Sequence, residues 1–558
     1  MPSLSNLRVY SHGSSTSAIH TPPTTGSPPG QTQPENSSSA SSVVEGVIFQ
    51  EPDVEVDLID GEQGSAAGMV ESRAGNEESK RNLRDQLRRT LSKKESSTAE
   101  QYLPRQYFVL TDAGKPVFVS DQDANSDSVT SMLGVAQALV SIFLDDGDKL
   151  RTINAGNMRI VFLLRPPLYY VCVSSWGEPE SVTRFHLEYL HLQILSVFSA
   201  EQLRRMFEQR RNFDLGRLLR GAEPLLYSLL SRLEWDLAMG TSSLHCLKLD
   251  PALRKCVADI LVPTSKIKDI LYVIMIAQGR VITLVRPRKH SIHPSDLHIL
   301  INTIHSPSIL NNSATASYLP VCLPKFNPSA FVNAYVMFLP RSDLQDAAKK
   351  PTSEADSESV RSNPDEQPAN ETASSNSSPS SSSTGRVPEI ALVAVSGSAD
   401  FELVRGWADN TIHRLSHDSL LKNLNDAISQ GSTEYSVSNL SIPGLRHFIY
   451  KSRSHVQITM PLFEDPYDSP NEKRRLVTLY QTLYDAIHAK SGQEHTLKLQ
   501  YIKTSQESVM GWITQPFELY IALSPRLPKS AAVNAANAIA RWVQKEEKQL
   551  FLRDAPVF

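Results

Sequence analysis

The sequence predicts an α/β (α+β) protein built from antiparallel sheets that are flanked by helices. Short runs rich in β-branched and aromatic residues, joined by turn residues, alternate with longer segments in which apolar residues recur every three to four positions. This alternation begins near residue 101 and continues to the C-terminus. The 558 residues therefore accommodate three sheet-and-helix units in tandem.

The first unit has the clearest pattern. Two strands are joined by a loop in which Gly114 is free to adopt positive φ, and a later helix is expected to be capped by Ser199 with Gln202 three positions on. The predicted strands are 107–111, 116–120, 150–154, 159–164 and 168–174, and the predicted helices are 128–144, 180–198 and 200–209. This order, β-β-α-β-β-β-α-α, predicts a five-stranded antiparallel sheet with one helix on one face and a helix pair on the other.

Weaker copies of the pattern follow. The second unit has the shortened order β-α-β-β-α, at 242–249, 252–260, 270–277, 280–285 and 294–304. The third is expected to contain 331–338, 389–395, 399–415, 447–460, 471–489, 496–502, 511–523 and 530–550. The predicted domains are therefore 102–222, 235–312 and 314–558, with an insertion at 342–387 inside the third.

Two segments have compositions typical of disorder. The arm 1–101 begins with a stretch rich in Ser, Thr, Pro and Gly, and the insertion 342–387 contains the run SSNSSPSSSST after an acidic first half. Such segments cannot bury enough apolar surface to offset the entropy of ordering them. We expect a disordered regulatory arm, in which phosphorylation controls a segment that masks a folded surface, and a long inserted loop.

Two stretches of the arm carry more specific patterns. Residues 43–60 alternate acidic and aliphatic side chains, which is typical of a strand that adds to a sheet edge; a solvated acidic spacer is the alternative. Residues 80–94 place three leucines on one helical stripe among basic residues that include Arg84, Arg88 and Arg89. This predicts a basic amphipathic helix for an anionic membrane surface or an acidic partner, with a transient solvated helix as the alternative.

Charge and cysteine usage argue against several classes of protein. Lys and Arg number 56 against 60 Asp and Glu, and the net charge of −4 argues against a protein that mainly coats nucleic acid. The four cysteines lie far apart, which predicts buried thiols in a reducing compartment. The longest apolar run, 270–277, is too short to span a bilayer, and the first residues lack a signal-peptide pattern. We expect a cytosolic protein whose membrane role, if any, is peripheral.

The sequence carries no strong catalytic signature. It contains no P-loop, GxGxxG, HExxH or GxSxG pattern. One cluster, formed by His290, His293, Asp296 and His298, has side chains that suit a metal. However, His293 and the proline after it mark a helix start, where an aspartate favours the helix dipole, so capping is the preferred interpretation. We expect a protein without catalytic residue, metal or cofactor, which holds another macromolecule in a particular conformation.

Several long blocks of sequence carry a family resemblance. They include YFVLTDAGKPVF at 107–118, SMLGVAQALVSIF at 131–143 and LVRPRKHSIHPSDLHILIN at 284–302. From about residue 101 to 558 the chain resembles the SAND family of vacuolar fusion proteins, the monensin-sensitivity (Mon) subunit of the Mon–Ccz guanine-nucleotide exchange factor. Pro166 and Tyr318 stand where the family tends to have Gly and Trp, and the Ser-rich insertion is long for the family.

The resemblance implies three longin domains and a set of partners. It implies that the chain pairs with a Ccz-type longin-domain subunit through the first longin domains of both. The pair would promote GDP release from the late-endosomal or vacuolar Rab GTPase, in endosome maturation and in vacuole or autophagosome fusion. The resemblance also implies recruitment by an early-endosomal Rab, binding to a phosphoinositide membrane surface, and a cytoplasmic location peripheral to late endosomes, vacuoles and autophagosomes.

The predicted interaction residues lie mainly in the first unit. A surface that binds the open switch loops of a Rab better than the closed ones lowers nucleotide affinity without any catalytic group. We predict this surface, or the surface for the Ccz-type partner, at Asp112, Lys115, Met132, Leu133, Gln137 and Ser141. Trp407 is predicted to bind the upstream Rab, with core packing as the alternative. The competing function is a longin-domain trafficking scaffold or tether that binds Rabs without exchange activity.

Overall fold

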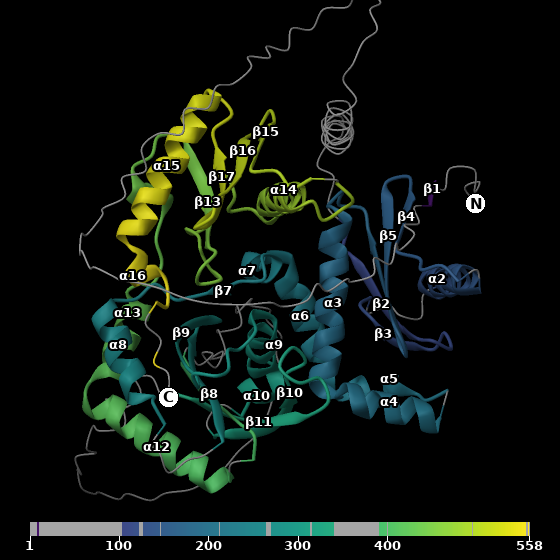
Figure 1. The fold of residues 1–558 in the computed structure, drawn as a ribbon, viewed down its shortest axis with the longest axis horizontal. Coiled ribbons are helices and arrows are strands. Elements are labelled where there is room, and N and C mark those ends of the chain that lie inside the picture. The colour runs from purple at the N-terminus through teal and green to yellow at the C-terminus, as the bar shows by residue number, and fades with distance from the viewer. Residues whose placement is uncertain are drawn as a thin grey trace, which may run out of the picture. The chain divides into compact units, whose positions relative to one another are not determined.

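The computed structural model describes residues 8–9, 103–121, 127–145, 147–210, 212–263, 269–312, 315–339, 390–398, 400–493, 495–553 and 556. Three sheets organise these residues (Figure 1). Apart from residues 8–9, the arm 1–101 lies outside the described residues, and so do its segments 43–60 and 80–94 with Arg84, Arg88 and Arg89. The predicted insertion 342–387 also lies outside them.

The first sheet confirms the predicted strands and contains one more. Its order is β1-β4-β5-β6-β2-β3, and neighbouring strands are antiparallel. The predicted strands are β2 (Gln106–Thr111), β3 (Pro116–Val119), β4 (Thr152–Ala155), β5 (Met158–Arg165) and β6 (Leu168–Ser174). The additional strand, β1 (Arg8–Val9), pairs with β4 at the edge of the sheet. The composition of the arm gave no indication of it.

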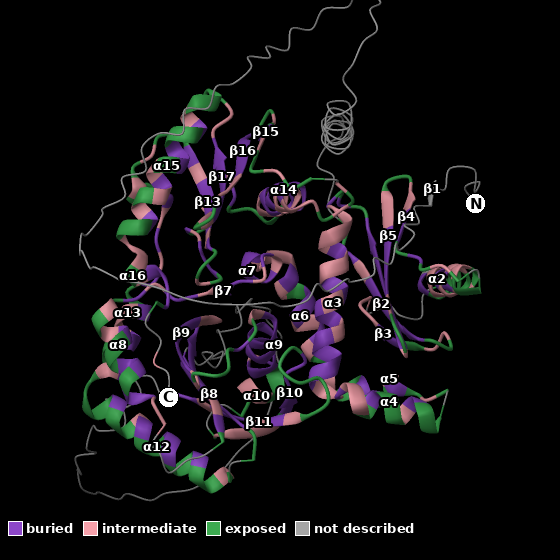
Figure 2. Ribbon diagram, in the orientation of Figure 1, coloured by how far each residue is buried: buried purple, intermediate pink, exposed green. Residues whose placement is uncertain are grey.

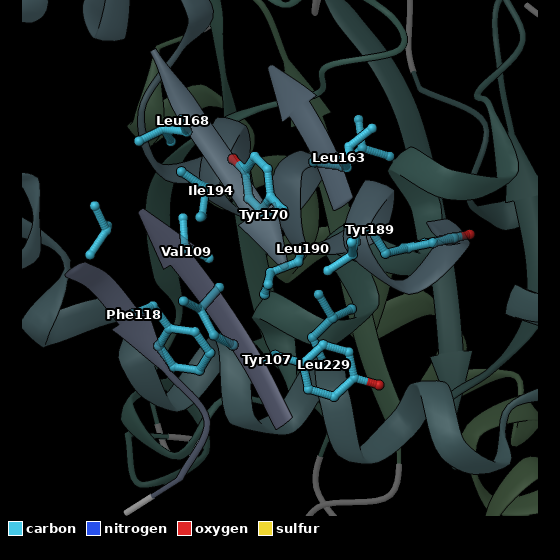
Figure 3. Packing of buried hydrophobic residues seen from close by; sticks show 14 of the residues in the cluster. Tyr107, Val109, Phe118, Leu163, Leu168, Tyr170, Tyr189, Leu190, Ile194 and Leu229 are labelled. Atoms are coloured by element: carbon cyan, nitrogen blue, oxygen red, sulfur yellow. The ribbon is translucent and has the colours of Figure 1, made fainter. Parts of the chain in front are cut away.

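Alternation along these strands gives the first sheet two apolar faces. On one face, Val109, Leu163 and Tyr170 belong to a core that Figure 3 shows in part. The helices of this core are α3 (Glu180–Val197), α4 (Ala200–Gln209), α5 (Leu215–Leu219) and α6 (Glu223–Trp235), with the short turn η2 (Arg220–Ala222) between the last two. On the other face, Phe108 and Phe162 pack against α2 (Asp127–Asp145). The prediction of helices on both faces is confirmed.

The predicted cap of α4 is also confirmed. The Ser199 side chain accepts a hydrogen bond from the Gln202 amide at 3.3 Å, and the Gln202 side chain accepts one from the Ser199 amide at 3.3 Å. This reciprocal capping box satisfies two amide groups that the helix itself leaves unpaired.

The second sheet corrects the predicted domain boundary. Its order is β10-β11-β12-β8-β9, from β8 (Ile270–Ala277), β9 (Arg280–Val285), β10 (Ser317–Cys322), β11 (Phe331–Phe338) and β12 (Ile390–Ser396). The prediction that assigned 314–338 and 389–395 to the third domain is wrong, because β12 lies at the centre of this sheet and pairs with β8 along its whole length. The segment between β11 and β12, which holds the insertion, therefore interrupts the second unit.

Helices cover both faces of the second sheet. One face packs against α8 (Pro251–Ile260), α12 (Phe401–His417) and α13 (Leu420–Ser429). The other packs against α9 (Pro294–Ile304), which the short α10 (Pro307–Leu310) follows. The helix predicted at 399–415 thus forms, but on the second sheet rather than the third.

The third sheet contains the C-terminal strands and one strand from far earlier in the chain. Its order is β15-β16-β17-β13-β14-β7. The strands are β13 (Leu445–Ser452), β14 (Gln457–Thr459), β15 (Leu499–Lys503), β16 (Ser508–Ile513), β17 (Phe517–Leu523) and β7 (Leu244–His245), which is parallel to β14. The helices of this unit are α15 (Lys529–Lys545), α16 (Glu547–Leu550) and α14 (Pro470–His488), with the short turn η3 (Val437–Leu440). The short helix α7 (Leu237–Gly240) precedes β7 in the chain.

A buried polar network joins helices of the first and second units. The Asn302 side chain on α9 donates hydrogen bonds to Oε1 of Gln193 on α3 at 2.9 Å and to the carbonyl of Leu225 on α6 at 2.9 Å. Ser228 on α6 donates to Oδ1 of Asn302 at 3.0 Å. Gln193 and Asn302 are fully buried. Because buried polar groups are costly to leave unpaired, this network fixes how the three helices pack.

Candidate functional site

The outer face of α2 is the most distinctive surface of the first unit. Helix α2 packs against the sheet through Val129, Ala136 and Val140. On its outer side Val135 and Ile142 are 50% and 57% exposed, and Figure 2 shows α2 mainly in the colours of partly buried and exposed residues. The sequence carries no charged residue from 128 to 144. A helix on a protein surface ordinarily has a charged or polar outer face, so this uncharged face indicates an interaction surface.

Small residues widen this surface. Gly134 directly precedes Val135, Ala138 lies between Val135 and Ile142 in the sequence, and all four residues are exposed. A Cβ atom built on Gly134 would have no heavy atom within 4 Å, so the space above it is open. A second helix or sheet can therefore approach the backbone of α2 closely here. We call Gly134, Val135, Ala138 and Ile142 the α2 outer face.

The first hairpin lies against the same helix. Gly114 has φ of +80°, and a Cβ atom placed there would come within 3.0 Å of the Gln137 side chain on α2. The loop is closed by hydrogen bonds from the Thr111 amide to the Lys115 carbonyl at 2.8 Å and from the Asp112 amide to the Pro167 carbonyl at 2.9 Å. The hairpin and α2 thus form one continuous surface, and the requirement for glycine at 114 is confirmed.

The predicted residues of this surface occupy different positions within it. Asp112 is exposed, and burial together with its carboxylate raises the pKa of Tyr169. Lys115 is half-buried and donates from Nζ to the Asn212 carbonyl at 3.1 Å. Met132, Leu133, Gln137 and Ser141 are half-buried rather than exposed.

Two of these predicted residues have a packing role. Met132 and Leu133 contact the core beneath α2, so they support the surface more than they form it. The residues that sequence reasoning missed are Gly134, Val135, Ala138 and Ile142. A helical projection could have found them, because they lie opposite the apolar stripe of Val129, Ala136 and Val140 and carry no charge.

Trp407 does not lie where the predicted Rab contact requires it. Its side chain on α12 is 7% exposed and belongs to the core beneath the second sheet. The prediction that it forms an exposed anchor for an upstream Rab is therefore wrong in this structure, and the alternative of core packing holds. The basic residues Arg84, Arg88 and Arg89 lie outside the described residues, so their membrane role stays a prediction.

The three histidines of the candidate metal cluster have separate partners. Nδ1 of His293 accepts a hydrogen bond from the Ser295 amide at 3.1 Å, as expected for a helix cap. His298 is buried and contacts the Ser243 carbonyl through Nε2 at 2.8 Å, while the His290 ring meets the Phe326 ring edge-on at 6.0 Å. In the described part of the chain, His, Cys, Asp and Glu side chains form no group of three that could hold a metal ion.

Buried polar pairs stiffen the sheet beneath the surface. Arg105 contacts Glu178 at 2.7 Å, and Ser174 donates to the same carboxylate at 2.8 Å. The Tyr107 hydroxyl lies 2.8 Å from Nδ1 of His186 on α3. Burial raises the pKa of Tyr107 and lowers the pKa of His186, so both stay uncharged at neutral pH. The sheet that carries α2 is thus a rigid support.

Comparison with known families assigns all three units. Models of the first, second and third longin domains of FUZ, MON1 and HPS1 match residues 105–229, 268–355 and 444–547. A protein named "Protein SAND" from Takifugu rubripes is 31% identical over 464 residues, which cover 83% of this chain and 79% of that protein. The chain belongs to the MON1/SAND family. Its architecture is that of three longin domains.

Other members of the MON1/SAND family agree. Vacuolar fusion protein MON1 of Cryptococcus neoformans is 49% identical over 82% of this chain, and vacuolar fusion protein MON1 homolog A of Gallus gallus is 32% identical over 80%. The chain spans 66% of the length of the Cryptococcus protein and 71% of the Gallus protein. Among the described residues, none of the helices combines the length and the apolar character needed to cross a membrane.

Proposed function

We propose that this chain is one subunit of a heterodimeric guanine-nucleotide exchange factor that acts in vacuolar fusion and endosomal trafficking. Its partner is a Ccz-type longin-domain subunit, and its substrate is the late-endosomal or vacuolar Rab GTPase. The observation that carries the proposal is the exposed, uncharged α2 outer face on the first longin domain. Family membership supports it, because relatives across fungi and vertebrates are named vacuolar fusion proteins.

The α2 outer face is proposed to bind the Ccz-type partner. Val135 and Ile142 lie seven positions apart, so their side chains project from the same side of the helix two turns apart. Packing them against an apolar partner surface removes both from water, and buried aliphatic side chains of this size each contribute about 1.5–3 kcal/mol. Open space above Gly134 permits close approach. Pairing in this way joins two longin domains into one rigid unit.

The neighbouring hairpin is proposed to contact the Rab. Asp112 and Lys115 offer opposite charges at the edge of the α2 surface, where a Rab switch loop can be recognised. A paired surface that binds the open switch more tightly than the closed one lowers nucleotide affinity by the same free energy. Each tenfold acceleration of GDP release requires about 1.4 kcal/mol of this preference. Chemical catalysis is not needed for this step.

Location and recruitment follow from the same proposal. The protein is cytoplasmic and acts peripherally on late endosomes, vacuoles and autophagosomes, where it is recruited by an early-endosomal Rab and a phosphoinositide surface. The basic segment with Arg84, Arg88 and Arg89 is the candidate membrane contact. We do not place the recruiting Rab at Trp407, because its side chain is buried.

Release of a fluorescent GDP analogue from the Rab tests the proposal. We expect fast release with the chain and its Ccz-type partner together, and no acceleration with either alone. Ile142→Arg in the α2 outer face should abolish it, whereas Leu403→Arg, which alters a comparably exposed leucine on α12, should not. Binding of the Rab by the pair without faster release would instead support a trafficking scaffold or tether.

A further inference from the structure

A cavity of about 330 Å³ lies between the second and third longin domains, remote in sequence from α2. Its walls come from the end of α6, the segment after β7, the start of β9, residues 433–435, the end of β14 and the first turn of α14. The lining residues that matter here are Trp235, Lys248, Arg280, Thr433, Glu434 and Lys473. A volume of this size is at the lower end of the range for small-molecule sites.

The charged side chains of this cavity are unbalanced. Lys248, Arg280 and Lys473 line the cavity together with a single carboxylate, Glu434, which pairs with Arg280 at 3.1 Å. His245 also lines the cavity, but burial and the nearby Arg280 lower its pKa to about 3, so it is neutral at physiological pH. The cavity therefore carries an excess of positive charge.

Lys473 is the least compensated of these charges. Its half-buried ammonium lies 4.4 Å from the ring centre of Phe463 and 5.1 Å from that of Trp235, and burial lowers its pKa. The following two residues are paired, Arg474 with Glu234 at 3.3 Å and Arg475 with Glu507 at 2.9 Å. Among the described residues, no carboxylate within ion-pair distance of Lys473 is found.

The position of Lys473 in its helix points the same way. It lies in the first turn of α14, next to Glu472. The amide groups at a helix start create a partial positive charge, which disfavours a cation and favours an anion. The two aromatic rings hold the ammonium at the cavity wall. A bound anion would thus offset the cost of placing the Lys473 cation at this end of the helix.

A neutral hydrogen-bonding group completes the site. Thr433 is 1% exposed, and its hydroxyl has no hydrogen-bond partner in the described part of the chain. Buried hydroxyl groups without a partner are uncommon, because each costs free energy. The Thr433 side chain lines the same cavity as Lys473 and Lys248. Its free hydroxyl can donate to an anionic oxygen there.

A neighbouring cavity differs from the cavity lined by Lys473 in its charge balance. That cavity, of about 310 Å³, shares Trp235, His245, Arg280 and Met460 with the cavity that Lys473 lines. Its additional charges, Arg232 and Asp236, form an ion pair at 3.0 Å. It therefore adds no unpaired cation, whereas the first cavity has Lys473.

We infer that the cavity lined by Lys248, Arg280, Thr433 and Lys473 binds a compact phosphate ester, with the phosphate between the two lysines and the Thr433 hydroxyl. Phosphate oxygens accept several charge-assisted hydrogen bonds at once, which suits this set of donors. The ligand is a soluble inositol phosphate or the headgroup of a membrane lipid, which offer the same chemistry. This site does not depend on the proposed exchange activity, since it shares no residue with the α2 outer face.

Calorimetric titration of the full chain with inositol trisphosphate tests the inference. We expect saturable binding that Lys473→Gln weakens by at least about tenfold, because a charge-assisted hydrogen bond is lost. Thr433→Val keeps the shape and the charge, and should weaken binding about threefold. Lys545→Gln removes an exposed charge on α15 and should leave binding unchanged.

Vesicles distinguish the two sources of the ligand. We use phosphatidylcholine vesicles that contain the phosphatidylinositol bisphosphate with the same headgroup. If the ligand is a lipid headgroup, Lys473→Gln should bind these vesicles less than the unmodified chain does. If the ligand is soluble, the two chains should bind the vesicles equally. Either result supports the site once titration has shown it. The inference is overturned if the unmodified chain does not bind inositol trisphosphate, or if Lys473→Gln and Lys545→Gln bind it equally well while both remain folded.

Discussion

The two helices that cover the first sheet, α2 and α3, differ in what their outer sides contact. The outer side of α3 is occupied by this chain itself, through Gln193 with Asn302 and through Ser181, which donates to Asp485 on α14. The outer side of α2 presents Val135 and Ile142 to solvent without a charge. Buried polar pairs specify one particular internal packing, whereas an exposed uncharged face is available to another chain. The same longin sheet therefore has one internal side and one external side.

The largest expected effect is on partner binding, when charged residues are introduced into the α2 outer face. Val135→Arg together with Ile142→Arg should weaken binding to the Ccz-type partner about a thousandfold, because two charges would be buried without a partner. The melting temperature of the chain alone should change little, since both positions are exposed. Binding is measured by calorimetry or by co-elution. Leu403→Arg with Val533→Arg is the matched control, and a similar loss there would contradict the contrast between α2 and the rest of the surface.

A smaller effect is expected from the internal side. Asn302→Leu leaves Oε1 of Gln193 and the carbonyl of Leu225 without their donor. This should lower the stability of the chain by roughly 2–3 kcal/mol, which thermal denaturation would report. Asn423→Leu on the exposed side of α13 serves as the control and should have little effect. An unchanged melting temperature for Asn302→Leu would mean that the network does not hold α3 to its neighbours.

The pH dependence of stability tests a second buried group on the internal side, the Asp296 carboxyl in the first turn of α9. Burial raises the pKa of Asp296 from 3.8 to about 6, although its carboxylate accepts hydrogen bonds from the Lys325 and Phe326 amides. Between these pH values the folded state keeps a proton that the unfolded chain has lost. Stability is therefore greatest below this window and falls as the pH rises through it, by roughly 3 kcal/mol.

Substitution of Asp296 isolates its contribution to the pH dependence of stability. Asp296→Asn should remove the part of the pH slope between pH 3.8 and about 6, while Asp259→Asn on the exposed side of α8 should preserve it. Denaturant titrations at several pH values give the slope. If Asp296→Asn and the unmodified chain have parallel pH profiles, Asp296 does not titrate as its burial indicates.

The smallest effect is expected in the first hairpin, at the edge of the α2 outer face. Lys115→Gln removes the contact with the Asn212 carbonyl, which is worth about 1 kcal/mol or less. If the hairpin contacts the Rab, GDP release by the pair should slow about fivefold while partner binding stays the same. Lys149→Gln, at an exposed position in the same domain, is the control. Loss of partner binding in Lys115→Gln would place the hairpin in the subunit interface instead.

Local elements could be read from the sequence because their signals are local. The loop at Gly114, the Ser199 cap and the strands of the first sheet all depend on residues within a few positions of one another. The domain boundary failed for the opposite reason. Whether β12 joins the second or the third sheet is decided by its pairing with β8, more than a hundred residues earlier, and its apolar sequence suits the centre of either sheet.

The candidate site was located only in part for a related reason. The helix and hairpin chosen from the sequence are the ones that carry the candidate surface, but Met132 and Leu133 face the core beneath α2 rather than solvent. Trp407 follows the same helical period as Val404 and Leu415, and that period could have placed it in the core. The cavity around Lys473 could not be predicted, because its walls come from segments that are widely separated in the sequence.

The way in which β11 leads into β12 has a practical consequence for work with this protein. The two strands are antiparallel neighbours, and the Leu339 amide donates to the Ile390 carbonyl at 2.9 Å. Both ends of the intervening segment therefore meet at a single point of the second sheet. A folded reporter whose own termini are adjacent can be spliced in there, which gives a fluorescent form of the protein with both chain ends and the α2 outer face left unmodified.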